Sequence, residues 1–143
     1  MKKSIEDIQK EIIEDFIIFD DWLDKYEHII EIARDLPMIS EDFKTDEYLI
    51  KGCQSKVWLH AELKEGKIYF SADSDAIITK GIVYLLVKVM NERTPKEILD
   101  AEMFFIDKIG LKENLSPTRS NGLVSMLKQM KLYALAYDAK MKK

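Results

Sequence analysis

The sequence predicts an α+β fold in which a small antiparallel sheet is covered by helices. Residues 55–63 alternate apolar and polar side chains, and a turn at 64–67 leads into the apolar stretch 68–70, which is typical of a β-hairpin. On both sides of this hairpin, apolar residues recur with the spacing of amphipathic helices. We expect the whole chain, 1–143, to form one domain, because a chain of this length can bury a single core.

Two helices are expected before the hairpin. The first opens at Ser4, a favourable capping residue, and the second opens at the acidic pair Asp20 and Asp21. Pro37 lies just beyond the end of the second helix. The apolar face of the first helix comprises Ile5, Ile8, Ile12 and Phe16. The apolar face expected for the second comprises Leu23, Tyr26, Ile30 and Ala33, with Trp22 and Ile29 alongside.

Residues 38–54 form a long connection with a helix-poor middle. Loops of this length are uncommon and are more often functional than not. A short strand is expected within the connection, at residues 47–50. The first strand of the hairpin should then direct Val57, Leu59, Ala61 and Leu63 to one face and Trp58, His60 and Glu62 to the other.

Three helices are expected after the hairpin. The first is strongly apolar, covers residues 75–91, and can be capped by Asp73 or Ser74. The second starts with a capping box at residues 94–97 and should continue through residues 104 and 105 to a stop near Gly110. The third starts in the same way at residues 116–117. Its apolar positions are Leu123, Met126, Leu127, Met130, Leu135 and Ala136.

The composition excludes several functional classes. The net charge is −4 and no RNA- or DNA-binding motif is present, so no nucleic acid partner is expected. No window approaches the ~18 uninterrupted apolar residues that a membrane span needs, and a lone thiol fits a reducing compartment, so we expect a cytoplasmic protein without membrane contact. Residues 1–50 carry a net charge of −9, which reflects either the solvated faces of amphipathic helices or a docking surface for a basic partner.

Metal binding is not expected. The single cysteine and the two histidines, His28 and His60, are fewer than the nitrogen and sulfur ligands that zinc or an iron–sulfur cluster normally takes. The sequence Asp73-x-Asp75 lacks the glycine and the glutamate that a calcium loop requires further on. No glycine-rich phosphate loop is present either, and no bound cofactor is expected.

Cys53 is the only cysteine and the candidate reactive residue. It follows Gly52, which permits backbone conformations that other residues avoid. Its other neighbours, Lys51, Gln54, Ser55 and Lys56, are polar. A partly exposed, electropositive loop of this kind lowers the pKa of a thiol and favours its reactions, whereas an inert cysteine usually lies in an apolar stretch. A structural role is the alternative for Cys53, and a cysteine protease would need a base histidine that nothing in the sequence brings to it.

Arg119 carries a positive charge at a position where the helix dipole disfavours one. It falls in the first turn of the last helix, where a cation opposes the helix dipole by ~0.3–1 kcal/mol. Its task is either pairing with an acid such as Asp75 or contact with a partner or the Cys53 thiolate. Asp75 itself needs no function beyond its place at a helix start. Gly81 and Gly122 lie inside helices, where glycine costs ~1 kcal/mol, so we expect close packing at both.

Six segments, spread in order over nearly the whole chain, form a specific pattern. They are Trp22-x-x-x-Tyr26-x-x-Ile29-Ile30, Leu36-Pro37, Gly52-Cys53-Gln54-Ser55-x-Val57-Trp58, Ala72-Asp73-Ser74-Asp75-Ala76 followed by Lys80-Gly81, Thr94-Pro95-x-x-Ile98, and Leu115-Ser116-Pro117-x-Arg119-x-x-Gly122-Leu123. With this pattern the chain resembles the SufE family, the sulfur-acceptor proteins of iron–sulfur cluster assembly.

The resemblance implies a SufE/IscU-like fold and a sulfur carrier. Such a protein takes persulfide sulfur from a pyridoxal-phosphate-dependent, SufS-like cysteine desulfurase onto Cys53, stimulates the desulfurase, and passes the sulfur to a SufBCD-like iron–sulfur scaffold. The implied supporting or partner-binding residues are Gly52, Gln54, Ser55, Asp75 and Arg119. The pyridoxal phosphate belongs to the desulfurase, so this chain itself carries no cofactor.

The resemblance thus implies a sulfur-transfer protein and desulfurase activator, not a stand-alone enzyme. An IscU-type assembly scaffold uses several ligands, which one cysteine cannot supply. Three alternatives stay open: a partner of a paralogous cysteine desulfurase, a non-catalytic adaptor that binds the desulfurase, and a thiol enzyme that acts without a partner.

Overall fold

The computed structural model describes residues 3–142, the side chains of Lys112 and Thr118 excepted, and confirms the predicted α+β class. In chain order the elements are α1 (Ile5–Ile17), α2 (Trp22–Ile32), the 3-10 turns η1 (Ala33–Asp35), η2 (Glu41–Phe43) and η3 (Asp46–Tyr48), β1 (Val57–Lys64), β2 (Lys67–Ser74), α3 (Ile77–Met90), α4 (Pro95–Asp100), α5 (Phe105–Lys108), α6 (Leu111–Asn114) and α7 (Pro117–Met141). Among the described residues, β1 and β2 form one antiparallel, two-stranded sheet.

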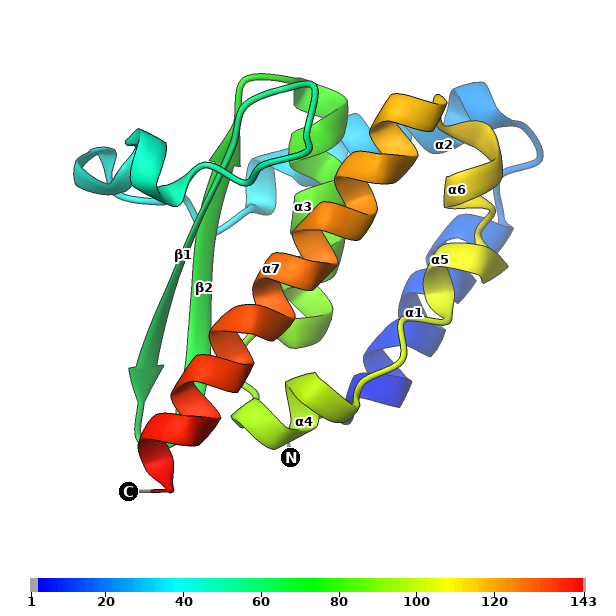
Figure 1. Cartoon of the computed structure of the whole chain (residues 1–143). Helices are drawn as coiled ribbons and strands as arrows, with labels where there is room; N and C mark the ends of the chain where they lie inside the picture. The colour runs from blue at the N-terminus through cyan, green and yellow to red at the C-terminus, as the bar shows by residue number, and fades with distance from the viewer. Residues whose placement is uncertain (1–2, 143) are drawn as a thin grey trace.

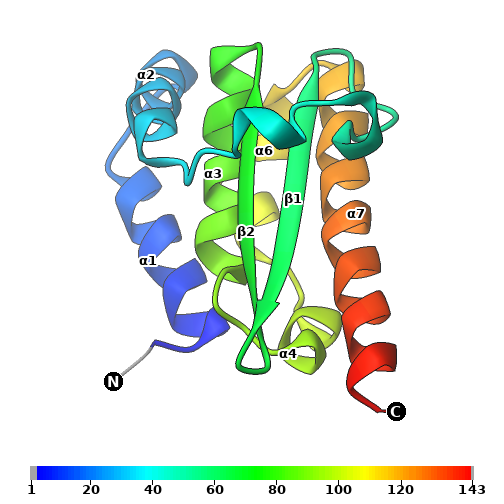
Figure 2. The ribbon, with the colours of Figure 1, turned by 90° about the vertical axis from the view of Figure 1, so that its left-hand side faces the viewer.

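The sheet has helices on one face and an irregular segment on the other. Helices α3 and α7 lie behind the two strands when the sheet faces the viewer (Figure 2), and α1 and α2 pack against α3 on the side away from the sheet (Figure 1). The connection that contains η2 and η3 crosses the outer face of the sheet near one end of the strands (Figure 2).

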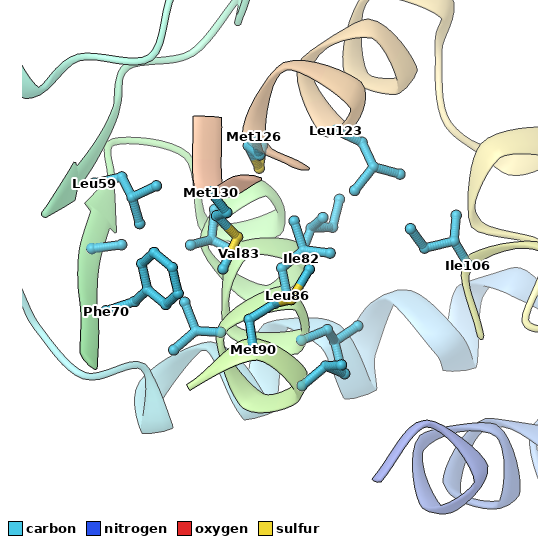
Figure 3. Close-up of a cluster of buried hydrophobic side chains, with 14 of the residues drawn as sticks. Leu59, Phe70, Ile82, Val83, Leu86, Met90, Ile106, Leu123, Met126 and Met130 are labelled. Carbon is cyan, nitrogen blue, oxygen red and sulfur yellow. The ribbon is translucent and has the colours of Figure 1, made fainter. Parts of the chain in front are cut away.

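The hydrophobic core lies between the sheet and helices α3 and α7. Figure 3 shows Leu59 and Phe70 of the sheet facing side chains of α3 and α7 that include Val83, Leu86 and Met130. The odd positions at the start of β1 are buried, as the alternating pattern predicts. Helix α3 is apolar on most of its circumference because it is buried between the sheet on one side and α1 and α2 on the other.

The predicted helix starts of α1, α2, α4 and α7 are confirmed. In each, a side-chain oxygen of the capping residue accepts a hydrogen bond from a backbone N–H of the first turn. The donor and acceptor residues are Asp7 and Ser4, Asp24 and Asp21, Glu97 and Thr94, and Arg119 and Ser116. In α4 the Glu97 carboxylate also accepts from the Thr94 N–H, which completes the predicted capping box.

The start of α3 differs from the prediction. The residue before the helix is Ala76, which offers no side-chain cap, and β2 continues to Ser74. Asp73 is therefore a strand residue, and its carboxylate forms ion pairs with Lys44 at 2.6 Å and Lys80 at 3.4 Å. The Ser74 hydroxyl accepts from the Ala76 N–H at 3.2 Å, before the helix begins. The capping prediction was wrong for both residues because β2 includes them, and Lys44 and Lys80 occupy the Asp73 carboxylate.

The second helix after the hairpin breaks where it was predicted to continue. Helix α4 ends at Asp100, and α5 starts only at Phe105. The fully buried side chain of Gln9 explains the break: its Nε2 donates to the Glu102 carbonyl oxygen at 2.9 Å, and its Oε1 accepts from the Phe105 N–H at 3.1 Å. Because these bonds satisfy the backbone of the intervening segment, a continuous helix is not needed there.

The buried face of α2 is rotated relative to the prediction. Leu23 and Ile30 are 69% and 42% exposed, whereas Ile29 is fully buried. The cause is a close approach of α3, where a Cβ at Gly81 would lie 2.3 Å from the Ile29 carbonyl oxygen. The close packing expected at Gly81 is thus confirmed, and it selects Ile29 for the interface.

The C-terminal half of α7 also uses a different face. Leu135 and Ala136 are exposed, and two tyrosines point toward β1 instead. Their hydroxyls donate hydrogen bonds to the edge of that strand, Tyr133 to the Leu59 carbonyl oxygen at 3.0 Å and Tyr137 to the Ala61 carbonyl oxygen at 2.9 Å. These bonds protect strand-edge carbonyls that could otherwise pair with another chain.

The strand expected at residues 47–50 is not formed. Among the described residues, the backbone pairing of this segment with β1 is an isolated bridge between Leu49 and Trp58. The connection is held on the sheet by ring contacts: Phe43 stacks on His60 with ring centroids 3.9 Å apart, and Tyr48 meets both rings edge-on. Side-chain stacking therefore replaces the predicted strand pairing.

Candidate functional site

Residues 51–56, called the Cys53 loop below, project from the end of the sheet where α7 begins (Figure 1). The base of the loop is closed by the Ile50 N–H, which donates to the Val57 carbonyl oxygen at 2.8 Å. Asp75 fixes the second side of the loop, because its carboxylate accepts from the Lys56 N–H at 3.0 Å and its own N–H donates to the Lys56 carbonyl at 3.2 Å. Asp75 therefore holds the Cys53 loop in place through its hydrogen bonds with Lys56, and it does not cap a helix.

Gly52 has a backbone conformation that favours glycine. Its φ of +92° lies in a region that other residues adopt only with strain. A Cβ at this position would also lie 2.6 Å from the Ser125 Oγ of α7. The backbone conformation of the closed loop therefore favours glycine here, whereas the serine hydroxyl can rotate away from an added Cβ.

Cys53 lies half-buried against α7. Its Sγ–H donates to the carbonyl oxygen of Gly122 at 3.6 Å, and a Cβ at Gly122 would be 3.5 Å from the sulfur, an ordinary contact distance. Burial raises the pKa of the Cys53 thiol. The lowered pKa predicted from Lys51 and Lys56 is therefore wrong for the closed loop, because both lysines are exposed and desolvation of the sulfur dominates.

A small cavity of about 20 Å³ separates the Cys53 loop from α3 and α7. Five residues singled out from the sequence line it: Cys53, Gln54, Ser55, Arg119 and Gly122. The volume exceeds the ~10–15 Å³ that one water molecule needs, so the cavity can hold a guest of about that size.

Arg119 is exposed at the rim of this cavity, in the first turn of α7. No ion pair within the described part of the chain joins Arg119 to Asp75. The interpretation of Arg119 as a structural partner of Asp75 is therefore wrong for this conformation. Among the described residues the Arg119 side chain has no ion-pair partner, and it lines the same cavity as Cys53.

Several residues of the site were missed from the sequence. Thr79 and Ile82 of α3 and Met126 of α7 line the cavity, and Ser125 lies against Gly52. Helical spacing carries a signal for them, because Thr79 shares the buried face of Ile82, and residues 125 and 126 follow Gly122 by one turn. This spacing indicates that the residues share a helix face, but it does not indicate that the Cys53 loop covers that face.

Beside the site, Asp73 near the end of β2 forms an ion pair with Lys44 in the connection 38–54. Burial alone would raise the pKa of the Asp73 carboxyl, but the hydrogen bond from Lys44, the Ser74 N–H and the charge of Lys80 lower it overall. Asp73 is therefore ionised at neutral pH, and through Lys44 it anchors the segment that precedes the Cys53 loop.

Within residues 3–142, no group of three or more His, Cys, Asp and Glu side chains is arranged to hold a metal ion. None of the described helices has both the length and the apolar character that crossing a bilayer requires.

Comparison with known proteins matches residues 10–134 to the SufE family, described as an Fe-S metabolism associated domain. An uncharacterized SufE-like protein of Rhizobium etli is 40% identical over 126 residues, which cover 85% of this chain and 85% of that protein. SufE-like protein 1 of Arabidopsis thaliana, named as chloroplastic/mitochondrial, is 40% identical over 117 residues, which cover 81% of this chain and 32% of that protein.

Among solved structures, a hypothetical protein from Thermus thermophilus superposes with a TM-score of 0.74 at 21% identity, over 90% of this chain and 94% of that chain. At this identity the likeness concerns the fold, which the two proteins share. The sequence matches go further, because they cover most of this chain and of the Rhizobium etli protein. The chain therefore belongs to the SufE family, and this membership supports a role in iron–sulfur metabolism as a sulfur-transfer protein.

Proposed function

We propose that this protein accepts persulfide sulfur on Cys53 from a pyridoxal-phosphate-dependent cysteine desulfurase, stimulates that enzyme by unloading it, and delivers the sulfur to an iron–sulfur scaffold. Membership of the SufE family implies an interaction with a cysteine desulfurase. The observation that carries the proposal is the position of the only thiol, on a glycine-hinged loop directly above a cavity large enough for one small guest. We propose a SufS-like donor, a SufBCD-like acceptor and a cytoplasmic setting.

The chemical step is a thiolate exchange on an S–S bond. The Cys53 thiolate attacks the terminal sulfur of the desulfurase persulfide, and a new bond forms between that sulfur and the Cys53 Sγ. The bond to the desulfurase cysteine breaks, and this cysteine leaves as a thiolate with the bonding electron pair. The proton that Cys53 released is balanced by one that the leaving thiolate takes up, so no external oxidant or reductant is consumed.

The closed loop is a resting state in this scheme. Burial raises the pKa of the Cys53 thiol, and the S–H bond to the Gly122 carbonyl holds the neutral form. Rotation of the loop about Gly52 would return the sulfur to water, beside the exposed Lys51 and Lys56, and would thereby lower its pKa. The desulfurase thus encounters the Cys53 thiolate of the open loop. The closed loop can shield the terminal sulfur of a Cys53 persulfide from solvent.

The other residues of the loop region have supporting roles in the proposal. Asp75 clasps the loop at Lys56, and Gly52 supplies the hinge. Gln54 is exposed and Ser55 is half-buried, so both can contact a docked desulfurase. Arg119, exposed at the cavity rim, serves the docked complex or the sulfur anion.

The test is intact-mass measurement after incubation with a cysteine desulfurase and free cysteine. We expect the wild-type protein to gain about 32 Da for each sulfur carried. Cys53→Ser should gain nothing while melting at the wild-type temperature, because a serine hydroxyl without a dedicated base is a poor nucleophile. Ser71→Ala, a change in β2 outside the Cys53 loop that keeps the thiol, is the control and should still be loaded.

Other outcomes identify the alternatives. If Cys53→Ser stimulates the desulfurase as well as the wild-type protein in the absence of added reductant, the chain is an adaptor and not a carrier. If loading occurs only with a paralogous desulfurase, the donor assignment changes. Turnover of a small thiol substrate without any desulfurase would establish a stand-alone enzyme.

A further inference from the structure

Thr79 is a buried polar residue beside Cys53 whose hydroxyl has no hydrogen-bond partner among the described residues. It lies in the first turn of α3, is 6% exposed, and lines the same cavity of about 20 Å³ as the thiol. A threonine inside a helix commonly donates to a carbonyl one turn earlier. The Thr79 hydroxyl makes no such bond among the described residues, and it is not one of the fully enclosed side-chain atoms without a partner, so it is reachable from the cavity. It can therefore donate a hydrogen bond to a guest in the cavity, whereas valine, which has the same shape, lacks this donor.

The size of the cavity restricts what the hydroxyl can meet. Its volume is just above the ~10–15 Å³ needed by one water molecule, so a guest in it touches the lining groups on every side. The walls provided by Ile82 and Met126 are apolar, and Arg119 is the cation among the residues that line it. The environment therefore suits a single large, polarisable, anionic atom that needs one hydrogen-bond donor.

We propose that the Thr79 hydroxyl donates a hydrogen bond to the terminal sulfur of the Cys53 persulfide when the loop is closed. This inference rests on the proposed function, since it assigns a binding residue for the sulfur that Cys53 carries. A hydrogen bond to an ionised acceptor in a water-excluded site is stronger than a neutral one in water. Ile82 and Met126 keep water and soluble reductants away from the same atom.

The hydroxyl then has a consequence for the transport cycle. In the unloaded protein the cavity has room for one water molecule, which is a neutral acceptor for the hydroxyl. Loading replaces it with an anionic sulfur, which accepts a stronger hydrogen bond, so the persulfide favours the closed loop more than the free thiol does. The sulfur is thus retained until docking on an acceptor opens the loop.

The test compares wild type with Thr79→Val and Thr79→Ser after Cys53 has been loaded with inorganic polysulfide. The loaded proteins are freed of excess reagent and treated with a water-soluble phosphine, which removes the terminal sulfur as a phosphine sulfide and leaves the thiol. Loss of about 32 Da is followed by intact mass. We expect Thr79→Val to lose its sulfur several-fold and up to about tenfold faster than wild type, and Thr79→Ser to restore the wild-type rate.

A second measurement separates this role from a structural one. Unloaded Thr79→Val should melt within about 2 °C of wild type, because no hydrogen bond joins the hydroxyl to another described residue. A hydroxyl that supported the fold would lower the midpoint by more than this when removed. Thr79→Ala, which also lacks the hydroxyl, provides the same comparison of sulfur loss should the valine disturb packing.

Equal rates of sulfur loss in wild type and both hydroxyl-free variants would overturn the proposal, and so would a failure of Thr79→Ser to restore retention. Polysulfide loading needs no partner, so the two levels of inference can fail separately. If the rates differ as expected but a desulfurase never loads the wild-type protein, the proposed function is wrong and the Thr79 contact stands. If desulfurase loading is normal and the rates are equal, the Thr79 contact is wrong and the carrier function stands.

Discussion

Replacement of Gly52 by alanine tests whether the Cys53 loop opens independently of the core. In the closed loop Gly52 has a φ of +92°, where an L-residue is strained by about 1–3 kcal/mol. The added Cβ would also lie 2.6 Å from the Ser125 Oγ, although the serine hydroxyl can rotate to relieve this contact. An open loop can relax the backbone, so the substitution should shift the closed-to-open ratio by the strain energy, about 5- to 150-fold toward the open form.

The assay is the rate at which iodoacetamide alkylates Cys53, followed by intact mass at a fixed pH near 8. Opening exposes the half-buried sulfur and removes the burial that raises its pKa, so both effects accelerate the reaction. While the open form remains rare, the rate should rise by the same factor as its population. The melting temperature should change little, because the loop rather than the core absorbs the strain.

Gly66→Ala is the matched control. Gly66 has a similar φ of +80° but lies in the turn at the far end of the hairpin, where a Cβ would have only an ordinary contact, 3.8 Å from the Met141 Cε. This control should lower the melting temperature by several degrees and leave alkylation of Cys53 unchanged. If Gly52→Ala behaves in the same way, with a lower midpoint and a wild-type alkylation rate, the loop is rigidly coupled to the core and the opening argument is refuted. Adding Ser125→Gly to Gly52→Ala separates the steric contact from the backbone strain.

Three further predictions concern groups around the loop. Asp75→Ala should accelerate alkylation of Cys53, because the Lys56 N–H loses its carboxylate acceptor, and Asp75→Asn should have a smaller effect. Equal alkylation rates in wild type and both variants would show that Asp75 does not hold the loop closed. Arg119→Ala should leave the melting temperature within about a degree of wild type while sulfur transfer falls, and a clearly lower midpoint with normal transfer would assign Arg119 a structural role. Because the pKa of the Asp73 carboxyl is lowered in the folded protein, its stabilisation is present above the ordinary carboxyl range and is lost as the pH falls below about 4. Lys44→Met should therefore flatten the decline of the melting temperature between pH 5 and pH 3, and an unchanged profile would speak against this pair.

The parts of the fold that depend on neighbours in sequence were predictable. A helix cap is a bond between residues two or three positions apart, so Ser4, Asp21, Thr94 and Ser116 identify their helices without reference to the rest of the chain. The alternation of β1 was equally informative, because Val57, Leu59 and Ala61 on one face of the strand are buried. The glycine at position 81 indicated close packing, although not which residue it would meet.

The parts that depend on distant partners were not predictable in this way. Gln9 stops α4 from continuing through bonds to residues more than ninety positions away. Asp73 has the sequence context of a helix cap, but Lys44 and Lys80 reach it from other elements. Neither arrangement leaves a periodic signal, because a single polar side chain can satisfy a distant backbone group from many positions in a sequence.

The candidate site shows the same division. The polar setting of Cys53 indicated a reactive loop, and the structure does place Gln54, Ser55 and Arg119 with it around one cavity. The direction of the thiol pKa shift was wrong, because it depends on how the loop packs against α7 and not on the charge of the neighbouring residues. Burial of a loop is a tertiary property, and a short polar motif does not encode it.

Helix α7 is held to the rest of the molecule much more firmly than the Cys53 loop is held to α7. Two tyrosine hydroxyls bond it to the edge of β1, and the Lys131 Nζ donates to the carbonyl oxygens of Leu99 and Ala101 at 3.2 and 2.7 Å. On its inner face Leu123 and Met130 are almost fully buried.

The Cys53 loop touches the same helix through a weak sulfur hydrogen bond of 3.6 Å, and Gly52 lies close to Ser125. A thiol is a weak donor and Cys53 is only half-buried, so release of the loop forfeits far less free energy than displacement of α7 would. A docking partner can therefore draw the sulfur out while the helix stays in place. Under the proposed function, the first turns of α7, with Arg119 exposed, would remain a fixed surface beside the loop that carries the sulfur.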